Sequence, residues 1–116
     1  MIGPVLAAAL AIAPQSTLSG SADPQTEADF RCYAASLVLA GVSAEDQEMV
    51  NAASMVAFYY LGRLEGRTPE TDWIRQGIEA GNSQPDVLIG ELPRCGGEFE
   101  AKSRELIDKS GDPSAS

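Results

Sequence analysis

Apolar residues in the middle of the chain, between Ser43 and Gly66, recur at the three- and four-residue steps of one helix face. This face consists of Met49, Ala52, Ala53, Val56, Tyr59, Tyr60 and Leu64. Ser43 can cap the start of the helix through its hydroxyl oxygen, and Gly66 can adopt the left-handed conformation that ends a helix. The pattern therefore predicts a central helix over residues 43–66, around which the rest of the chain packs.

A second helical pattern precedes the central helix. Asp23-Pro24 is a favourable cap and first helical position, and Thr26 offers a second start. Gly41 provides a stop. One face of this helix carries Phe30, Tyr33, Ala34, Leu37 and Val38. Because only a few residues separate it from the central helix, we expect the two to pack as an antiparallel pair.

Two shorter helical patterns follow the central helix. Thr68-Pro69-Glu70 has the residue types of a cap, a first position and an acidic first turn, so we expect a helix from there to about Ala80. A turn over residues 81–84 should follow, and residues 85–92 can form two further helical turns. The residues expected to face inward from the first of these helices are Trp73, Ile74 and Ile78.

The last segment contains several breakers. Pro93 lacks an N–H group and should kink or end the preceding helix. Residues 94–97 then form a loose joint, and residues 98–109 are predicted to form the final helix. The residues that should face inward from it are Phe99, Leu106 and Ile107. No stretch alternates apolar and polar residues as a strand would, which predicts an all-α fold.

The first 22 residues contain no charged side chain. Their apolar centre, residues 4–13, is shorter than the roughly 20 residues that span a bilayer, and it fits a secretory signal peptide. Gly20-Ser21-Ala22 supplies small residues for a cleavage site, and Ala11-Ile12-Ala13 is a second candidate. We expect a signal peptide over 1–22, a helical domain over 23–110 and a disordered tail over 111–116. The alternative is a loosely helical or disordered N-terminal arm.

The two cysteines, Cys32 and Cys95, lie on either side of the central helix. A disulfide is the usual state of such a pair in an exported protein, and closing a loop of about 60 residues contributes roughly 4 kcal/mol in the chain-entropy model. A redox CxxC is absent, two cysteines without histidine do not supply a zinc site, and a cysteine nucleophile would lack its histidine base. We therefore predict a small bundle of four to five helices, stapled by one disulfide, in a periplasmic or secreted protein.

The formal net charge is −9, and the chain has no histidine. Such a chain repels nucleic acid and anionic lipid, so we expect neither as a partner, and no membrane contact after processing. The missing histidine also counts against a serine, histidine and acid hydrolase. The 17 carboxylates are typical of a solvated surface, and no phosphate loop or calcium loop is present. We expect no enzyme activity, no cofactor and no metal. Any response to pH must come from the carboxylates.

The stretch from Phe58 to Gly66 is the most specific part of the sequence. Aromatic residues on adjacent positions point in different directions, and Gly62 lies inside a strong helix, where a close neighbour would explain its missing side chain. Core packing and a helix end explain most of these residues. The sharper hypothesis is an interaction surface for a second copy or another protein. Its candidate members are Phe58, Tyr59, Tyr60, Leu61 and Leu64.

Several of these features together resemble the periplasmic acid-stress chaperones of the HdeA/HdeB type. They are the signal peptide, the aromatic-X-Cys step Phe30-Arg31-Cys32, the helix ending 59–66, and a late cysteine followed by a charged helix with Phe99. The resemblance implies a helical bundle with one disulfide, folded as a homodimer at neutral pH. In acid it would dissociate and partly unfold, exposing apolar surface that holds unfolding clients. Pro93, Gly96 and Gly97 depart from the family by breaking a region that it keeps helical.

A second hypothesis comes from a different class of protein. Small periplasmic immunity proteins that inhibit secreted cell-wall hydrolases are also helical, disulfide-bearing and often acidic. In that interpretation the acidic surface would block the active-site cleft of one specific toxin. An accessory subunit of an enzyme is a third possibility. All three hypotheses describe a domain that binds other proteins without catalysis.

Overall fold

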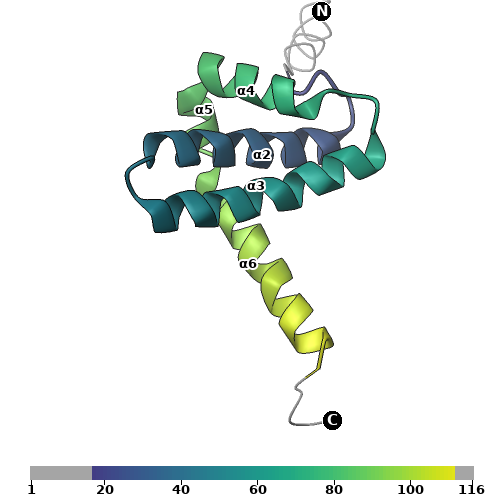
Figure 1. Ribbon diagram of the computed structural model, residues 1–116. Coiled ribbons are helices and arrows are strands. Elements are labelled where there is room, and N and C mark those ends of the chain that lie inside the picture. The colour runs from purple at the N-terminus through teal and green to yellow at the C-terminus, as the bar shows by residue number, and fades with distance from the viewer. Residues whose placement is uncertain (1–16, 112–116) are drawn as a thin grey trace, which may run out of the picture.

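The computed structural model describes residues 17–111, which fold into a helical bundle (Figure 1). In chain order the helices are α2 (Pro24–Val42), α3 (Gln47–Arg67), α4 (Trp73–Ser83), α5 (Pro85–Ile89) and α6 (Leu92–Lys109). Within the described residues no strand occurs, so the all-α prediction is confirmed. Most of the predicted signal peptide and all but the first residue of the predicted tail lie outside the described residues.

Helices α2, α3 and α4 each begin at an aspartate cap. The carboxylates of Asp23, Asp46 and Asp72 accept hydrogen bonds from backbone N–H groups in the first turns of α2, α3 and α4. The predicted starts at Ser43 and Thr68 are wrong by a few residues. Ser43 instead accepts a backbone hydrogen bond from Asp46 at 2.8 Å, which closes the short loop between α2 and α3. A carboxylate is a strong acceptor at a helix start, so it outcompetes the nearby hydroxyl.

The glycines predicted to end or loosen helices do not do so. Helices α2 and α3 continue past Gly41 and Gly66 by one residue each, α4 runs through Gly81, and α6 runs through Gly96 and Gly97. Within the described residues, a positive φ occurs only at two other glycines. A glycine costs a helix about 1 kcal/mol relative to alanine, which packing and a disulfide can outweigh.

Pro93 starts a helix instead of ending one. It lies at the second residue of α6, where its missing N–H needs no partner. The preceding helix α5 ends at Ile89, close to the predicted limit. The loose joint predicted over 94–97 is therefore wrong. The sequence suggested that Pro93, Gly96 and Gly97 break a region that the HdeA/HdeB family keeps helical, but this region is helical here as well.

Helix α2 lies at the centre of the bundle, between α3 and α4, and it packs antiparallel to α3 as predicted (Figure 1). It supplies more of the core than any other helix. The fully or almost fully buried apolar residues are Phe30, Cys32, Tyr33, Ala34 and Ala35 from α2, Ala53, Ala57, Tyr60 and Leu64 from α3, and Trp73, Ala80, Leu88 and Cys95 from the later helices. Two of the residues predicted for the buried face of the central helix, Met49 and Ala52, are exposed.

Helix α6 begins against the bundle and then leaves it (Figure 1). Its first turns are anchored through Cys95, whereas Leu106 and Ile107 near its end are each 68% exposed. The prediction that these two residues face inward is wrong, because the helix extends past its neighbours. Ile74 and Ile78 of α4 are also about half exposed, while Trp73 is buried as predicted.

Candidate functional site: an apolar groove on the helical bundle

The five residues predicted to form an interaction surface do not share one surface. Phe58 is 72% exposed, whereas Tyr60 and Leu64 are core residues with 1% and 0% exposure. Tyr59 and Leu61 are intermediate. Successive helix residues are about 100° apart, so a continuous run of five cannot face one way. The prediction fails for Tyr60 and Leu64 in the folded state, and it leaves Phe58 and Leu61 on a common face.

Phe58 and Leu61 line an apolar groove between α2, α3 and α4. The groove has a volume of about 240 Å³, and none of its lining residues is charged. Alanine and serine side chains form much of its wall, and Phe58 and Ile74 are its most exposed bulky members. The complete lining is Tyr33, Ser36, Leu37, Ala40, Ala53, Ser54, Ala57, Phe58, Leu61 and Ile74. A concave, uncharged surface of this kind is suited to binding apolar side chains of another molecule.

A second depression of about 320 Å³ lies on the neighbouring flank of α2, where α2 faces α4 and the start of α5. It shares Leu37 with the first groove, and Val42 and Ile78 are half exposed or more in its lining. No charged residue lines it. The two depressions meet at Leu37, so uncharged residues line the surface of α2 along both of them.

The position of α4 beside the groove depends on a glycine. A Cβ atom at Gly77 would overlap the ring of Tyr33 and lie 3.2 Å from Leu37 Cδ1. The missing side chain lets α4 approach α2 closely, which places Ile74 at the groove. Gly62, where the sequence suggested a close neighbour, has no such contact within 4 Å. The expectation of a close neighbour at Gly62 is therefore wrong, and the glycine that does meet one is Gly77 of α4.

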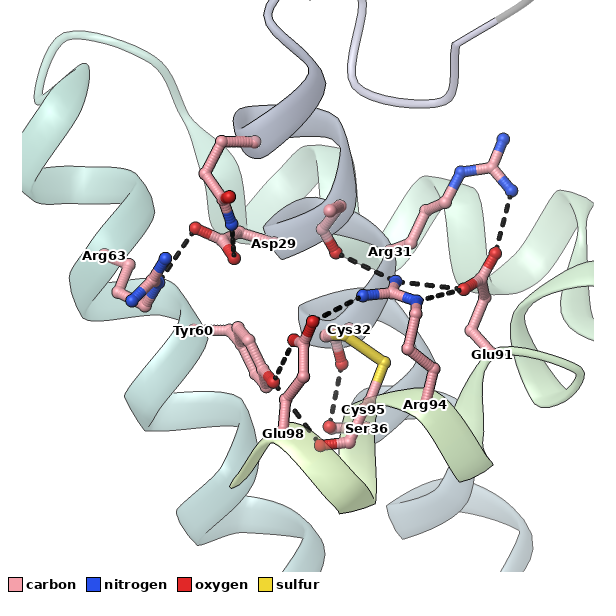
Figure 2. The surroundings of a disulfide bond; sticks show 12 residues. Asp29, Arg31, Cys32, Ser36, Tyr60, Arg63, Glu91, Arg94, Cys95 and Glu98 are labelled. Carbon is pink, nitrogen blue, oxygen red and sulfur yellow. Dashed lines mark hydrogen bonds and ion pairs between the residues drawn. A yellow bond between two sulfur atoms is a disulfide. The ribbon is translucent and has the colours of Figure 1, made fainter. Parts of the chain in front are cut away.

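A buried aspartate joins α2 to the C-terminal half of α3. Asp29 is 1% exposed, and its carboxylate accepts a hydrogen bond from Arg63 Nε at 2.9 Å (Figure 2). It also accepts one from Arg67 Nη2. The amide of Gln25 donates to it at 3.0 Å. The hydrogen bond to Asp29 is the main cause that raises the pKa of Arg63. This carboxylate thus holds two cations of the next helix in place.

The disulfide between Cys32 and Cys95 is present as predicted and joins α2 to the start of α6, with a Cα–Cα distance of 5.4 Å. Polar groups of both helices surround it (Figure 2). Arg31 pairs with Glu91 at 3.1 Å, and Arg94 pairs with Glu91 at 2.9 Å. The Arg31 pair holds the α5–α6 junction against α2 beside the covalent link, and Arg94 adds a hydrogen bond from α6 to the Ala28 carbonyl of α2 at 3.3 Å.

Tyr60 connects the core to the same region. Its hydroxyl donates to a carboxylate oxygen of Glu98 at 3.0 Å (Figure 2). Burial raises the pKa of Tyr60, and the hydrogen bond to Glu98 raises it further. The phenol therefore remains a neutral donor at any physiological pH. On the next residue, the Tyr59 ring lies edge-on to Phe99 of α6, with 5.6 Å between ring centroids.

Glu27 is a second inward-facing carboxylate on α2. Burial opposes its ionisation, but hydrogen bonds from the Leu18 backbone, the Ser19 hydroxyl and Arg31 outweigh this effect and lower its pKa. The ion pair with Arg31 is 2.7 Å long. Helix α2 therefore carries two carboxylates, Glu27 and Asp29, that form ion pairs with arginine side chains.

Over residues 17–111, no group of three or more histidine, cysteine, aspartate and glutamate side chains is placed to hold a metal ion. None of the helices within that range has the length and apolar character needed to cross a bilayer. The apolar groove is the feature of this fold best suited to binding another molecule.

Comparisons of the chain with protein-family models, with curated proteins and with solved structures found no match. The function must therefore be argued from the groove and the groups that support it.

Proposed function

We propose that this chain is a periplasmic protein-binding domain that acts as an acid-stress holdase. The apolar groove beside Phe58 provides the first contact with a client. Acid then loosens the contacts that hold the helices around α2 and exposes further apolar surface. The observation that carries the proposal is the uncharged groove with an exposed phenylalanine, on a domain whose net charge is −9.

The charged groups of α2 supply a physical reason for opening in acid. Asp29 is the shared anionic partner of Arg63 and Arg67, so the contact between α2 and the end of α3 depends on a carboxylate charge. Full protonation of the carboxylates would change the net charge from −9 toward +8, because the chain has eight lysine and arginine residues. Repulsion among these cations and the loss of ion pairs both favour a more open chain.

The contribution of Glu27 to the stability of the fold also decreases in acid. Its pKa is lowered in the folded state from an ordinary value of 4.5. A lowered carboxylate pKa stabilises the fold above the unfolded value, and this stabilisation is lost as the pH falls through the folded value. The contribution of Glu27 is thus complete at neutral pH and disappears in strong acid.

Opening would not release the chain completely. The disulfide keeps α2 attached to α6 at any pH. Core residues of α3, including Tyr60 and Leu64, would become accessible when α3 separates from α2, and they would extend the groove. These two residues belong to the sequence-based interaction surface, which in this proposal forms only in the opened state.

The test is the aggregation of a client enzyme that unfolds in acid, followed by light scattering with the oxidised protein at equal mass. Measurements at about pH 2–3, below the ordinary carboxylate range, and at pH 7 compare the two states. We expect suppression in acid and little at pH 7. A control sample exposed to acid and returned to pH 7 should lose its activity, because the groups ionise again and the bundle closes.

The absence of suppression at both pH values would refute the holdase function. One observation then favours the immunity function, since the groove already exists in the folded state and needs no opening. In that case a single secreted cell-wall hydrolase should bind at pH 7 with 1:1 stoichiometry. Size-exclusion chromatography at both pH values also tests the homodimer that the family resemblance implies.

A further inference from the structure

We propose that residues 17–22, here named the strap, belong to the folded domain and remain in the exported protein. The signal peptide would then end before Thr17, earlier than the Gly20-Ser21-Ala22 site that the sequence favours. This inference rests on the export of the chain, which is part of the proposed function, but not on the holdase activity.

The strap is attached to Glu27 by three hydrogen bonds. The backbone N–H groups of Leu18 and Ser19 donate to the two carboxylate oxygens, each at 2.9 Å, and the Ser19 hydroxyl donates at 2.6 Å. Ser19 is only 8% exposed, and the Glu27 side chain is 15% exposed. Three donors converging on a half-buried carboxylate form a specific contact, of the kind expected for a segment of the domain itself.

The strap also has a defined local structure. Gly20 has a φ of +77°, a conformation that favours glycine, and its N–H donates to the Thr17 hydroxyl at 3.2 Å. The Ser21 hydroxyl accepts a bond from the N–H of Asp23 at 3.1 Å, so the strap leads directly into the residue that caps α2. These turns are encoded by residues that the signal-peptide interpretation treats only as small.

Apolar contacts fix the strap on the bundle as well. Leu18 packs against the hydrophobic core. Residues 17–20 line one recess together with Ala80 and Ser83 of α4. The strap is therefore anchored in the core at Leu18 and faces α4 across this recess.

A cut after Ala22 would remove all of these contacts. Glu27 would keep Arg31 but lose three donors while remaining partly buried, which is unfavourable for a charged acceptor. The new α-ammonium group would lie on Asp23, at the positive end of the α2 dipole, where a cation is disfavoured. A cut after Ala13, the second small-residue site in the sequence, would leave the strap intact.

The experiment is secretion of the full chain by a bacterium with its own signal sequence, followed by intact-mass analysis of the oxidised product. We expect a first residue at or before Thr17. A product that begins at Asp23 would overturn the inference. A chain that keeps Met1 and stays in the cytoplasm would contradict the proposed export. In that case the thermal stability of two variants still tests whether the strap belongs to the folded domain.

Two variants of the same full chain test the contact directly. Ser19→Ala removes one donor and Glu27→Gln removes the charge that all three donors bind. We expect Tm to fall by a few degrees for the first and by roughly 5–10 °C for the second. Glu70→Gln is the matched control, because Glu70 is exposed and makes no ion pair within the described residues. An unchanged Tm for Ser19→Ala, together with a Glu27→Gln effect no larger than that of the control, would overturn the inference.

Discussion

Substitution of the buried carboxylate that links α2 to α3 gives the sharpest test of how the bundle is held together. Asp29→Asn keeps the size of the side chain and its hydrogen bond to Gln25, but it removes the charge that Arg63 and Arg67 share. Removing one partner of a buried ion pair costs about 3–5 kcal/mol. The two arginine side chains are 36% and 31% exposed, so water recovers part of this loss.

We therefore expect a loss of about 2–3 kcal/mol in the free energy of unfolding, after the discount for solvent exposure of the arginines. For a domain of this size such a loss lowers Tm by roughly 10–20 °C. Thermal unfolding followed by circular dichroism at pH 7 measures it.

Asp108→Asn is the matched control for this prediction. Asp108 lies near the exposed end of α6 and makes no ion pair within the described residues, so its substitution should change the free energy of unfolding by less than about 0.5 kcal/mol. If Asp29→Asn were no more destabilising than this control, the ion-pair cluster would not hold α3 to α2. That result would remove one of the charged contacts on which the proposed opening depends.

Three further predictions test the packing, the staple and the pH response. Gly77→Ala should lower the free energy of unfolding in urea by about 1–3 kcal/mol, because the new Cβ overlaps a tyrosine of α2. Gly62→Ala, where the space is open, should raise it by about 0.4–1 kcal/mol, and changes of the same sign for both variants would contradict the packing of α4. Replacing both cysteines with alanine should cost about 4 kcal/mol, and a loss under about 1 kcal/mol would show that the disulfide contributes little. Glu27→Gln should destabilise at pH 7 but not well below pH 4.5, as measured by urea unfolding across that range; an equal loss at both would mean that the charge of Glu27 is unimportant.

The sequence allowed prediction of the elements whose signals are local. The antiparallel pair α2–α3, the all-α class and the disulfide all follow from periodic apolar residues, short connections and two cysteines in a chain with the sequence features expected of an exported protein. Helix limits were less accurate, because glycines at 41, 66, 96 and 97 are weak signals. Each costs about 1 kcal/mol, and packing of the surrounding helix can outweigh it.

The groove depends on tertiary packing and could be predicted only in part. Phe58 and Leu61 were named from their aromatic and apolar character, but the partner surface requires the orientation of α4. That orientation follows from the close approach at Gly77, which depends on contacts with α2 and not on the local sequence of α4. For the same reason Ile74 was predicted to be buried and is instead half exposed beside the groove.

The ion-pair cluster was not predicted from the sequence. Asp29 is an almost fully buried carboxylate of α2, next to the core residue Phe30. Arg63 and Arg67 are four residues apart on α3, so they lie on one side of that helix, and both point toward Asp29. An acidic residue within an apolar face, with a spaced pair of arginines in the neighbouring helix, is the pattern that would have revealed it.

The central claim is that the apolar groove binds other proteins, and one comparison tests it most directly. Phe58→Asp and Ile107→Asp both replace a highly exposed apolar residue with the same charge, but only the first lies in the groove. Client aggregation in acid is measured for both variants beside the wild type at equal mass. If the groove binds clients, the Phe58→Asp variant should suppress aggregation much less than the wild type, while the Ile107→Asp variant should suppress it as well as the wild type. Equal activity of the two variants would contradict it.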